Sequence, residues 1–248
     1  MRSVVALLSM HAITNAILFT LGYYWLGMGD ARTSQLLLSA LIAIVFVALG
    51  CASYGAVLVY CGSTSLRSAR FAWLEAIWHL PALFVLAIAV ALIYWLAGLG
   101  RSALDEPAFR LASWLTFQFR RPVTPESVAF GVNVLFEFLR WIVIPVLVLP
   151  LSMNVALHGF SGFRQPKTNE RKRLYWVMAP LLLGAMVWLP WRLLAWIPRV
   201  GSFDMEATSF ILRALVAYLF FVLGWLGLAF ITSGGRPRFT QPSTAHSP

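Results

Sequence analysis

The sequence predicts an all-α protein, a polytopic membrane helix bundle with about six transmembrane helices. The chain is 60% hydrophobic and only 11% charged, whereas a soluble domain carries about a quarter charged residues. Its hydrophobic residues form long blocks that reach the roughly 20 residues a helix needs to cross the hydrocarbon layer. These blocks do not alternate as the strands of a membrane β-barrel do, so we expect helices to satisfy the backbone polar groups.

Six blocks of sufficient length define the expected spans and together form one domain over residues 1–233. The spans cover residues 3–28, 36–62, 71–99, 129–157, 174–198 and 207–233. The first block is longer than the roughly 7–15 apolar residues of a signal-peptide core, so we expect it to remain as a span. The end, 234–248, is rich in Gly, Pro, Ser and Thr and is expected to be a disordered cytoplasmic tail.

Two structures fit the longest connection, residues 100–128. The sequence DEP at 105–107 favours a helix start, and an amphipathic helix there would lie flat at the outer membrane interface. Residues 109–119 also alternate between apolar and other side chains, which favours an extended segment. The following helix has a clear start, with Thr124 as the expected N-cap and Pro125 in the first turn.

The second span carries small residues and both cysteines of the chain. Ala52 and Ala56 form a small-xxx-small pair, which is typical of a close helix contact in membranes. Cys51 and Cys61 lie ten residues apart on one helix, or about 15 Å along its axis. A disulfide requires Cα atoms within about 7 Å, so we expect both thiols to be free.

The basic residues between the blocks predict the orientation of the chain. With a cytoplasmic N-terminus, ten basic residues fall in inside segments and six in outside segments, which places both termini in the cytoplasm. Arginine outnumbers lysine by 17 to 2. This ratio and the compact size indicate a bacterial cell inner (cytoplasmic) membrane.

The run RQPKTNERKR at 164–173 is the strongest single orientation signal. It is expected to face the anionic headgroups of the lipid bilayer on the cytoplasmic side. A docking site for an acidic protein partner is the alternative. No aromatic residue interrupts the run, as stacking on nucleic-acid bases would require, so we expect no nucleic acid as a partner.

Polar residues inside the spans provide the candidate binding site. Asn133, Glu137 and Arg140 follow i, i+4, i+7 spacing, which places them within one arc of about 60° on a helix. Glu137 and Arg140 are also spaced to pair with each other. The predicted orientation places these residues in the outer third of the fourth span.

Two more arginines are expected at the same outer level. Arg192 lies close to the outer end of the fifth span, and Arg213 about two turns into the sixth. Three arginines against one carboxylate leave a positive excess, which an anionic lipid or a small anionic ligand could complete. The alternative is that the arginines snorkel to the interface beside neighbouring tryptophans.

A weaker group of polar residues lies toward the cytoplasmic side. His11 in the first span and Glu75 and His79 in the third could form a proton or polar relay, because histidine titrates near neutral pH. Hydrogen bonds between helices are the simpler explanation. No Cys/His spacing resembles a zinc site, so the sequence predicts no metal and no cofactor.

Two function classes remain open. The first is a non-catalytic membrane protein that scaffolds, assembles or regulates a partner. The second is a transporter or lipid-handling protein that binds an anionic group through the outer Arg/Glu cluster. The sequence contains neither a phosphate-binding loop nor a nucleophile motif in a span, so no catalytic residue is predicted.

Overall fold

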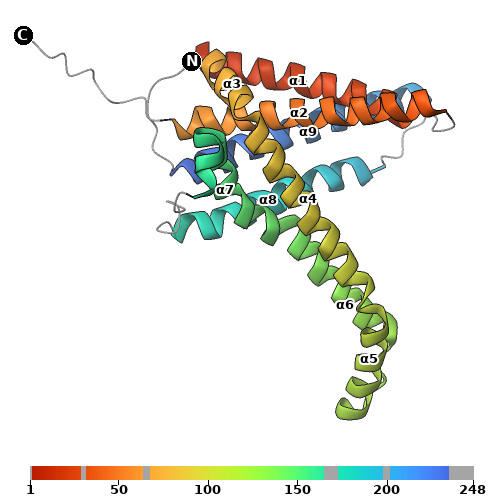
Figure 1. Ribbon diagram of the computed structural model, residues 1–248. Helices are drawn as coiled ribbons and strands as arrows, with labels where there is room; N and C mark the ends of the chain where they lie inside the picture. The colour runs from red at the N-terminus through yellow and green to blue at the C-terminus, as the bar shows by residue number, and fades with distance from the viewer. Residues whose placement is uncertain (1, 29–31, 64–67, 165–172, 198–201, 235–248) are drawn as a thin grey trace, which may run out of the picture. The chain divides into compact units, whose positions relative to one another are not determined.

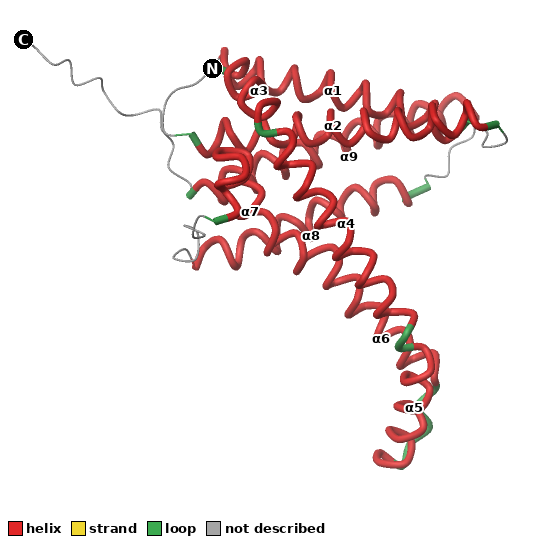
Figure 2. The backbone as a smooth tube through the Cα atoms, in the orientation of Figure 1, coloured by secondary structure: helices red, strands yellow, loops and turns green. Residues whose placement is uncertain are grey.

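The computed structural model of the chain is helical throughout its described residues, 2–28, 32–63, 68–164, 173–197 and 202–234 (Figures 1 and 2). No strand occurs within these ranges. The helices are α1 (Arg2–Leu26), α2 (Thr33–Gly62), α3 (Ala69–Trp78), α4 (Leu80–Ser102), α5 (Asp105–Phe119), α6 (Pro125–Phe138), the π-helical turn η1 (Leu139–Val143), α7 (Ile144–His158), the 3₁₀ turn η2 (Gly159–Phe163), α8 (Arg173–Ala195) and α9 (Phe203–Ser233).

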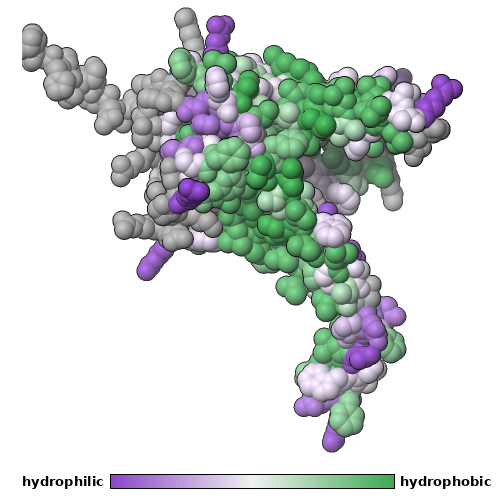
Figure 3. Space-filling model, in the orientation of Figure 1, coloured by the Kyte–Doolittle hydropathy of each residue, from purple (hydrophilic) through white to green (hydrophobic). Residues whose placement is uncertain are grey.

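Six helical segments are long and apolar enough to cross a membrane, which confirms the predicted fold class. They are Val5–Leu26, Thr33–Gly62, Leu80–Ser102, Pro125–Phe163, Arg173–Ala195 and Phe203–Ser233. Large apolar side chains such as Phe19, Leu37 and Ile211 lie exposed on these helices, and apolar residues cover much of the visible surface of α1 and α2 (Figure 3). A surface of this kind is stable in lipid rather than in water. The protein is therefore a multi-pass membrane protein.

The third apolar block differs from the predicted single helix over 71–99. It forms two helices, α3 and α4, with a break at His79. Pro81 has no N–H group with which to continue the backbone hydrogen bonds of α3. The His79 ring bonds the carbonyl oxygen of Ala156 through Nδ1 at 2.8 Å, which holds the break in place. Only α4 is long enough to span the membrane.

The connection over 100–128 contains a helix, so the extended alternative is wrong. Helix α5 begins at Asp105, the position that the DEP sequence indicates. Ala108 and Ala112 are buried on one face of α5, and α5 folds back beside α6 (Figure 1). The Thr116 hydroxyl donates to the Val123 carbonyl and accepts from the Val123 N–H, which closes the hairpin.

The start of α6 is confirmed, but the helix that follows contains an unpredicted π-helical turn. The Thr124 side chain accepts a hydrogen bond from the Ser127 N–H, and Pro125 occupies the first turn. The helical path then passes through η1, where the Arg140 carbonyl accepts a hydrogen bond from the Tyr94 hydroxyl at 2.7 Å. π-Helical turns within α-helices are frequent at functional sites.

The chain divides into two compact units, each built from separate segments. Unit 1 contains Met1–Val85, Pro150–Tyr175 and Leu226–Pro248; unit 2 contains Leu86–Leu149 and Trp176–Trp225. The residues 165–172 of the predicted basic loop and 235–248 of the predicted tail lie outside the described residues.

Small residues bring the helices of unit 1 into close contact. Ala52 and Ala56 of α2 are buried, as are Ala72 and Ala76 of α3, and α3 packs against α2. A Cβ atom on Gly55 would lie 2.9 Å from Leu83 and 3.5 Å from the Ala76 Cβ. This packing needs residues without large side chains. Neither Cys51 nor Cys61 forms a disulfide, as predicted.

Candidate functional site

Asn133, the first residue of the predicted polar face, joins α6 to α4 in unit 2. Its Oδ1 atom accepts a hydrogen bond of 2.8 Å from Nε of Arg101, near the end of α4. Arg101 lies in the last turn of α4, whereas Asn133 lies within α6. Glu137 lies four residues further along the helix, about 6 Å deeper along its axis.

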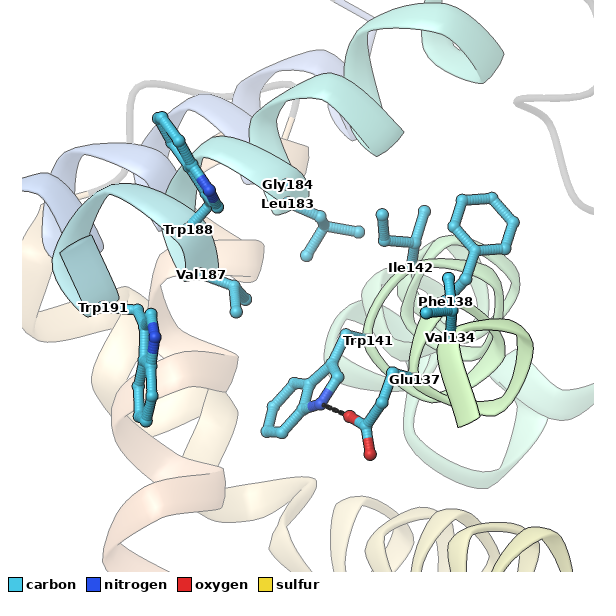
Figure 4. Close-up of a pocket in the computed structure, with 10 residues that line it drawn as sticks. All are labelled: Val134, Glu137, Phe138, Trp141, Ile142, Leu183, Gly184, Val187, Trp188 and Trp191. Atoms are coloured by element: carbon cyan, nitrogen blue, oxygen red, sulfur yellow. Dashed lines mark hydrogen bonds between the residues drawn. The ribbon is translucent and has the colours of Figure 1, made fainter. Parts of the chain in front are cut away.

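Glu137 hydrogen bonds an indole rather than a basic residue. Nε1 of Trp141 donates to Oε2 of Glu137 at 2.6 Å (Figure 4). The expected pair with Arg140 is not formed, since no ion pair joins these two described residues. Glu137 and Trp141 stand one turn apart on the same helix face. The indole N–H gives the carboxylate one hydrogen bond but, being neutral, does not neutralise its charge.

An open groove lies between the α6–η1 helix and α8, with Glu137 on its wall (Figure 4). We call it the tryptophan groove, and its volume is about 340 Å³. It is lined by Val134, Glu137, Phe138, Trp141, Ile142, Leu183, Gly184, Val187, Trp188 and Trp191. Among the described residues that line the groove, Glu137 is the only ionisable one. The groove therefore offers an apolar, aromatic surface with one negative charge.

Arg140 lies beside this groove, in the π-helical turn. Its guanidinium carbon is 5.7 Å from the ring centre of Tyr94 and 5.7 Å from that of Trp141. Such stacking stabilises a cation by about 0.5–1 kcal/mol at an exposed site. The side chain is exposed, and its guanidinium has no hydrogen-bond acceptor among the described residues.

Arg192 has a similar environment on α8. Its guanidinium carbon is 5.6 Å from the ring centre of Trp188, a residue of the tryptophan groove. The side chain is exposed and, within the described part of the chain, its N–H groups bond no acceptor. Arg140 and Arg192 thus each lie against an indole whose ring also lines the groove.

Arg213 is a buried structural residue, with 8% of its surface exposed. Its Nε donates to the Ser209 carbonyl at 3.1 Å, and Nη1 donates to the carbonyls of Leu193 and Trp196. The last carbonyls of a helix have no partner within the helix. Arg213 supplies donors and positive charge to the C-terminal end of α8, which stabilises the helix dipole.

The predicted cluster is therefore only partly assembled. Glu137, Arg140 and Arg192 lie in or beside the tryptophan groove, whereas Arg213 caps α8. No hydrogen bond or ion pair connects these four described side chains with one another. The site predicted from the sequence included neither Trp141 nor Trp188. The signal that could have found Trp141 was its i, i+4 spacing from Glu137.

The weaker polar group is distributed over separate contacts in unit 1. His11 is buried and its Nδ1 lies 2.8 Å from the Ser53 hydroxyl of α2. His79 instead bonds Ala156 and packs against Gly159, whose φ of +61° is favourable for glycine. Glu75 lies one turn before His79 on α3. The contacts of His11 and His79 connect helices, as the simpler explanation predicts.

The described residues contain no group of three or more His, Cys, Asp or Glu side chains able to hold a metal ion. The described residues of unit 2 bring together an open aromatic groove, one carboxylate and two neighbouring arginines. In comparisons with known proteins, the sequence matches no family model, no curated protein and no solved structure.

Proposed function

We propose that this chain is a non-catalytic protein of the cell inner (cytoplasmic) membrane that assembles with a partner membrane protein through the tryptophan groove. In this proposal both termini are cytoplasmic and the groove lies toward the outer side of the membrane. The partner contributes a transmembrane helix with a basic or hydrogen-bonding side chain opposite Glu137.

The position of Glu137 carries this proposal. The carboxylate is exposed within a predicted span and its hydrogen-bond partner is an indole. An ionised side chain in the hydrocarbon region costs about 2.5–3.5 kcal/mol on insertion scales. A partner that donates to Glu137 would offset this cost. The apolar walls of the groove would add the packing contacts that drive helix association in lipid.

Site-specific photocrosslinking in the native membrane tests the assembly. A photoreactive amino acid at Val187, in the groove, is expected to give one protein adduct of defined mass. Glu137→Gln should abolish that adduct. Glu126→Gln is the matched control, because Glu126 lies in the first turn of the same helix but outside the groove. Adducts with lipid alone, or a protein adduct that is unchanged in Glu137→Gln, would contradict the proposal.

A second candidate function is the binding of an anionic lipid or small anion by Arg140 and Arg192. Its support is the pair of exposed guanidinium groups, which have no hydrogen-bond acceptor among the described residues. Guanidinium groups bind phosphate and carboxylate through parallel hydrogen bonds. Arg213 is not included, because backbone carbonyls occupy its donors.

The amount of anionic phospholipid that co-purifies with the protein distinguishes the anion-binding function from the assembly function. Replacing Arg140 and Arg192 by Gln should remove a co-purifying anionic phospholipid from the protein in native mass spectra. The protein adduct at Val187 should persist if the groove binds a partner helix independently of these arginines. An unchanged lipid complement in the double variant would exclude the anion site.

A further inference from the structure

A polar cluster lies in the interior of unit 1, apart from the tryptophan groove. His11 and Asn15 stand one turn apart on α1, and Ser53 and Tyr54 face them from α2. His11 is 2% exposed, Asn15 is 5% exposed and Ser53 is 1% exposed. His11 lies nine residues from the start of α1, or about 14 Å along the helix axis, so the cluster lies deep in a span.

His11 and Asn15 each have one polar side-chain atom with a hydrogen-bond partner. Nδ1 of His11 lies 2.8 Å from the Ser53 hydroxyl oxygen. Oδ1 of Asn15 accepts a hydrogen bond of 3.4 Å from the Tyr54 hydroxyl. The Tyr54 ring also meets the His11 ring edge-on, with 5.1 Å between centroids. These contacts fix both side chains against α2.

The second polar side-chain atom of each residue has no hydrogen-bond partner among the described residues. Nε2 of His11 and Nδ2 of Asn15 are fully buried atoms without a hydrogen bond to any described residue. A buried polar group left unpaired carries a free-energy cost in the folded protein. Two such atoms lie in this one cluster, so the cost arises twice.

Reassigning the amide orientation does not remove this cost. Exchanging the oxygen and nitrogen of Asn15 would bring Nδ2 to the Tyr54 hydroxyl and leave Oδ1 without a partner. The hydroxyl of the neighbouring residue Thr14 donates to the Met10 carbonyl at 2.9 Å, within α1. One end of the Asn15 amide is unpaired in either orientation.

We propose that His11 and Asn15 hold one water molecule in the interior of unit 1, bound by Nε2 and Nδ2. Side chains at i and i+4 lie on one face of a helix with Cβ atoms about 5–6 Å apart, so both unpaired atoms belong to the same face of α1. Water accepts from the Asn15 amide, and it can donate to or accept from Nε2 according to the imidazole tautomer. The four side chains of the cluster include no carboxylate and no Lys or Arg, which suits a neutral ligand.

Nuclear magnetic resonance of protein with ¹⁵N-labelled histidine, in deuterated detergent micelles, tests the site. We expect a cross-peak between water and the His11 ring, assigned by its loss in His11→Phe. The exposed ring of His158 is the control and should contact only rapidly exchanging water. The His11 cross-peak should instead report a water molecule with a long residence time. Absence of a long-lived water at His11 in the folded protein would overturn the proposal.

Two matched variants show whether the water is shared. Asn15→Leu removes one of its two partners, so the Nε2 resonance of His11 should shift and the water cross-peak should weaken or disappear. Thr14→Val removes a hydroxyl that bonds only the backbone, so both signals should stay unchanged. If Asn15→Leu also leaves both signals unchanged, no water bridges the two residues.

Discussion

Arginine residues of this chain differ in function according to what surrounds each guanidinium group. Arg213 is buried and donates to carbonyls at the end of α8, whereas Arg192 is exposed and stacks on one indole. Sequence spacing places both near the outer ends of their helices and treats them alike. The difference depends on the C-terminal end of α8, where the carbonyls of Leu193 and Trp196 accept hydrogen bonds from Arg213.

Arg213→Met should lower the free energy of unfolding by about 2 kcal/mol, because the carbonyls at the end of α8 lose the donors of a buried side chain. Arg192→Met is the control and should cost about 1 kcal/mol or less, the value of an exposed cation–π contact. Unfolding by SDS in mixed micelles measures both changes. Equal effects of the two substitutions would show that Arg213 does not cap α8.

Gly162 is a second residue whose surroundings allow a sharp prediction. A Cβ atom there would lie 2.4 Å from the Asn154 carbonyl oxygen and 2.7 Å from the Val155 nitrogen. Backbone atoms cannot move aside as a side chain can, so Gly162→Ala should destabilise the protein by about 1–3 kcal/mol. Gly50→Ala should be neutral or stabilising, because nothing lies within 4 Å of its added methyl group. Thermal unfolding in detergent compares the two variants.

At the scale of the helical element, local signals were predicted well and contacts between helices were not. The Thr124 cap depends on a few adjacent residues, so the sequence predicts it. The DEP sequence indicates the start of α5, although an extended segment also fitted this connection. The break at His79 has a local cause in Pro81, but the contact that holds it uses Ala156, which is distant along the chain. The tryptophan groove likewise combines residues of the α6–η1 helix with others from α8. Hydropathy and spacing cannot specify such pairs.

Pro81→Ala should straighten the break between α3 and α4. The substitution restores an N–H donor, so backbone hydrogen bonds can continue from α3 into α4. Spin labels at Phe71 and Val85, both in unit 1, would then approach the separation of about 21 Å expected for fourteen residues of a straight helix. Pulsed electron paramagnetic resonance measures this distance after Cys51 and Cys61 are replaced by Ala. An unchanged distance would show that the His79 contact alone maintains the break.

On the scale of the whole molecule, charge must determine which side of the membrane each connection faces. Hydropathy identifies the six spans but does not distinguish the two orientations of the chain across the membrane. Basic residues do distinguish them, because they favour the cytoplasmic side. With a cytoplasmic N-terminus, ten basic residues fall in inside segments. The connection over 100–128 would then lie outside although it carries four basic residues, which favours the opposite orientation. The energy of this bias is about 1 kcal/mol per basic residue near an anionic surface.

Single cysteines at positions 120 and 164 should therefore react on opposite sides of the membrane. In protein with Cys51 and Cys61 replaced by Ala, a membrane-impermeant maleimide should label Arg120→Cys in intact cells. It should label Arg164→Cys only after the membrane is opened, because that residue begins the basic run. The reverse pattern would turn the tryptophan groove toward the cytoplasmic side. Glu137 would then face a partner helix at that side, while the groove itself and its residues would be the same.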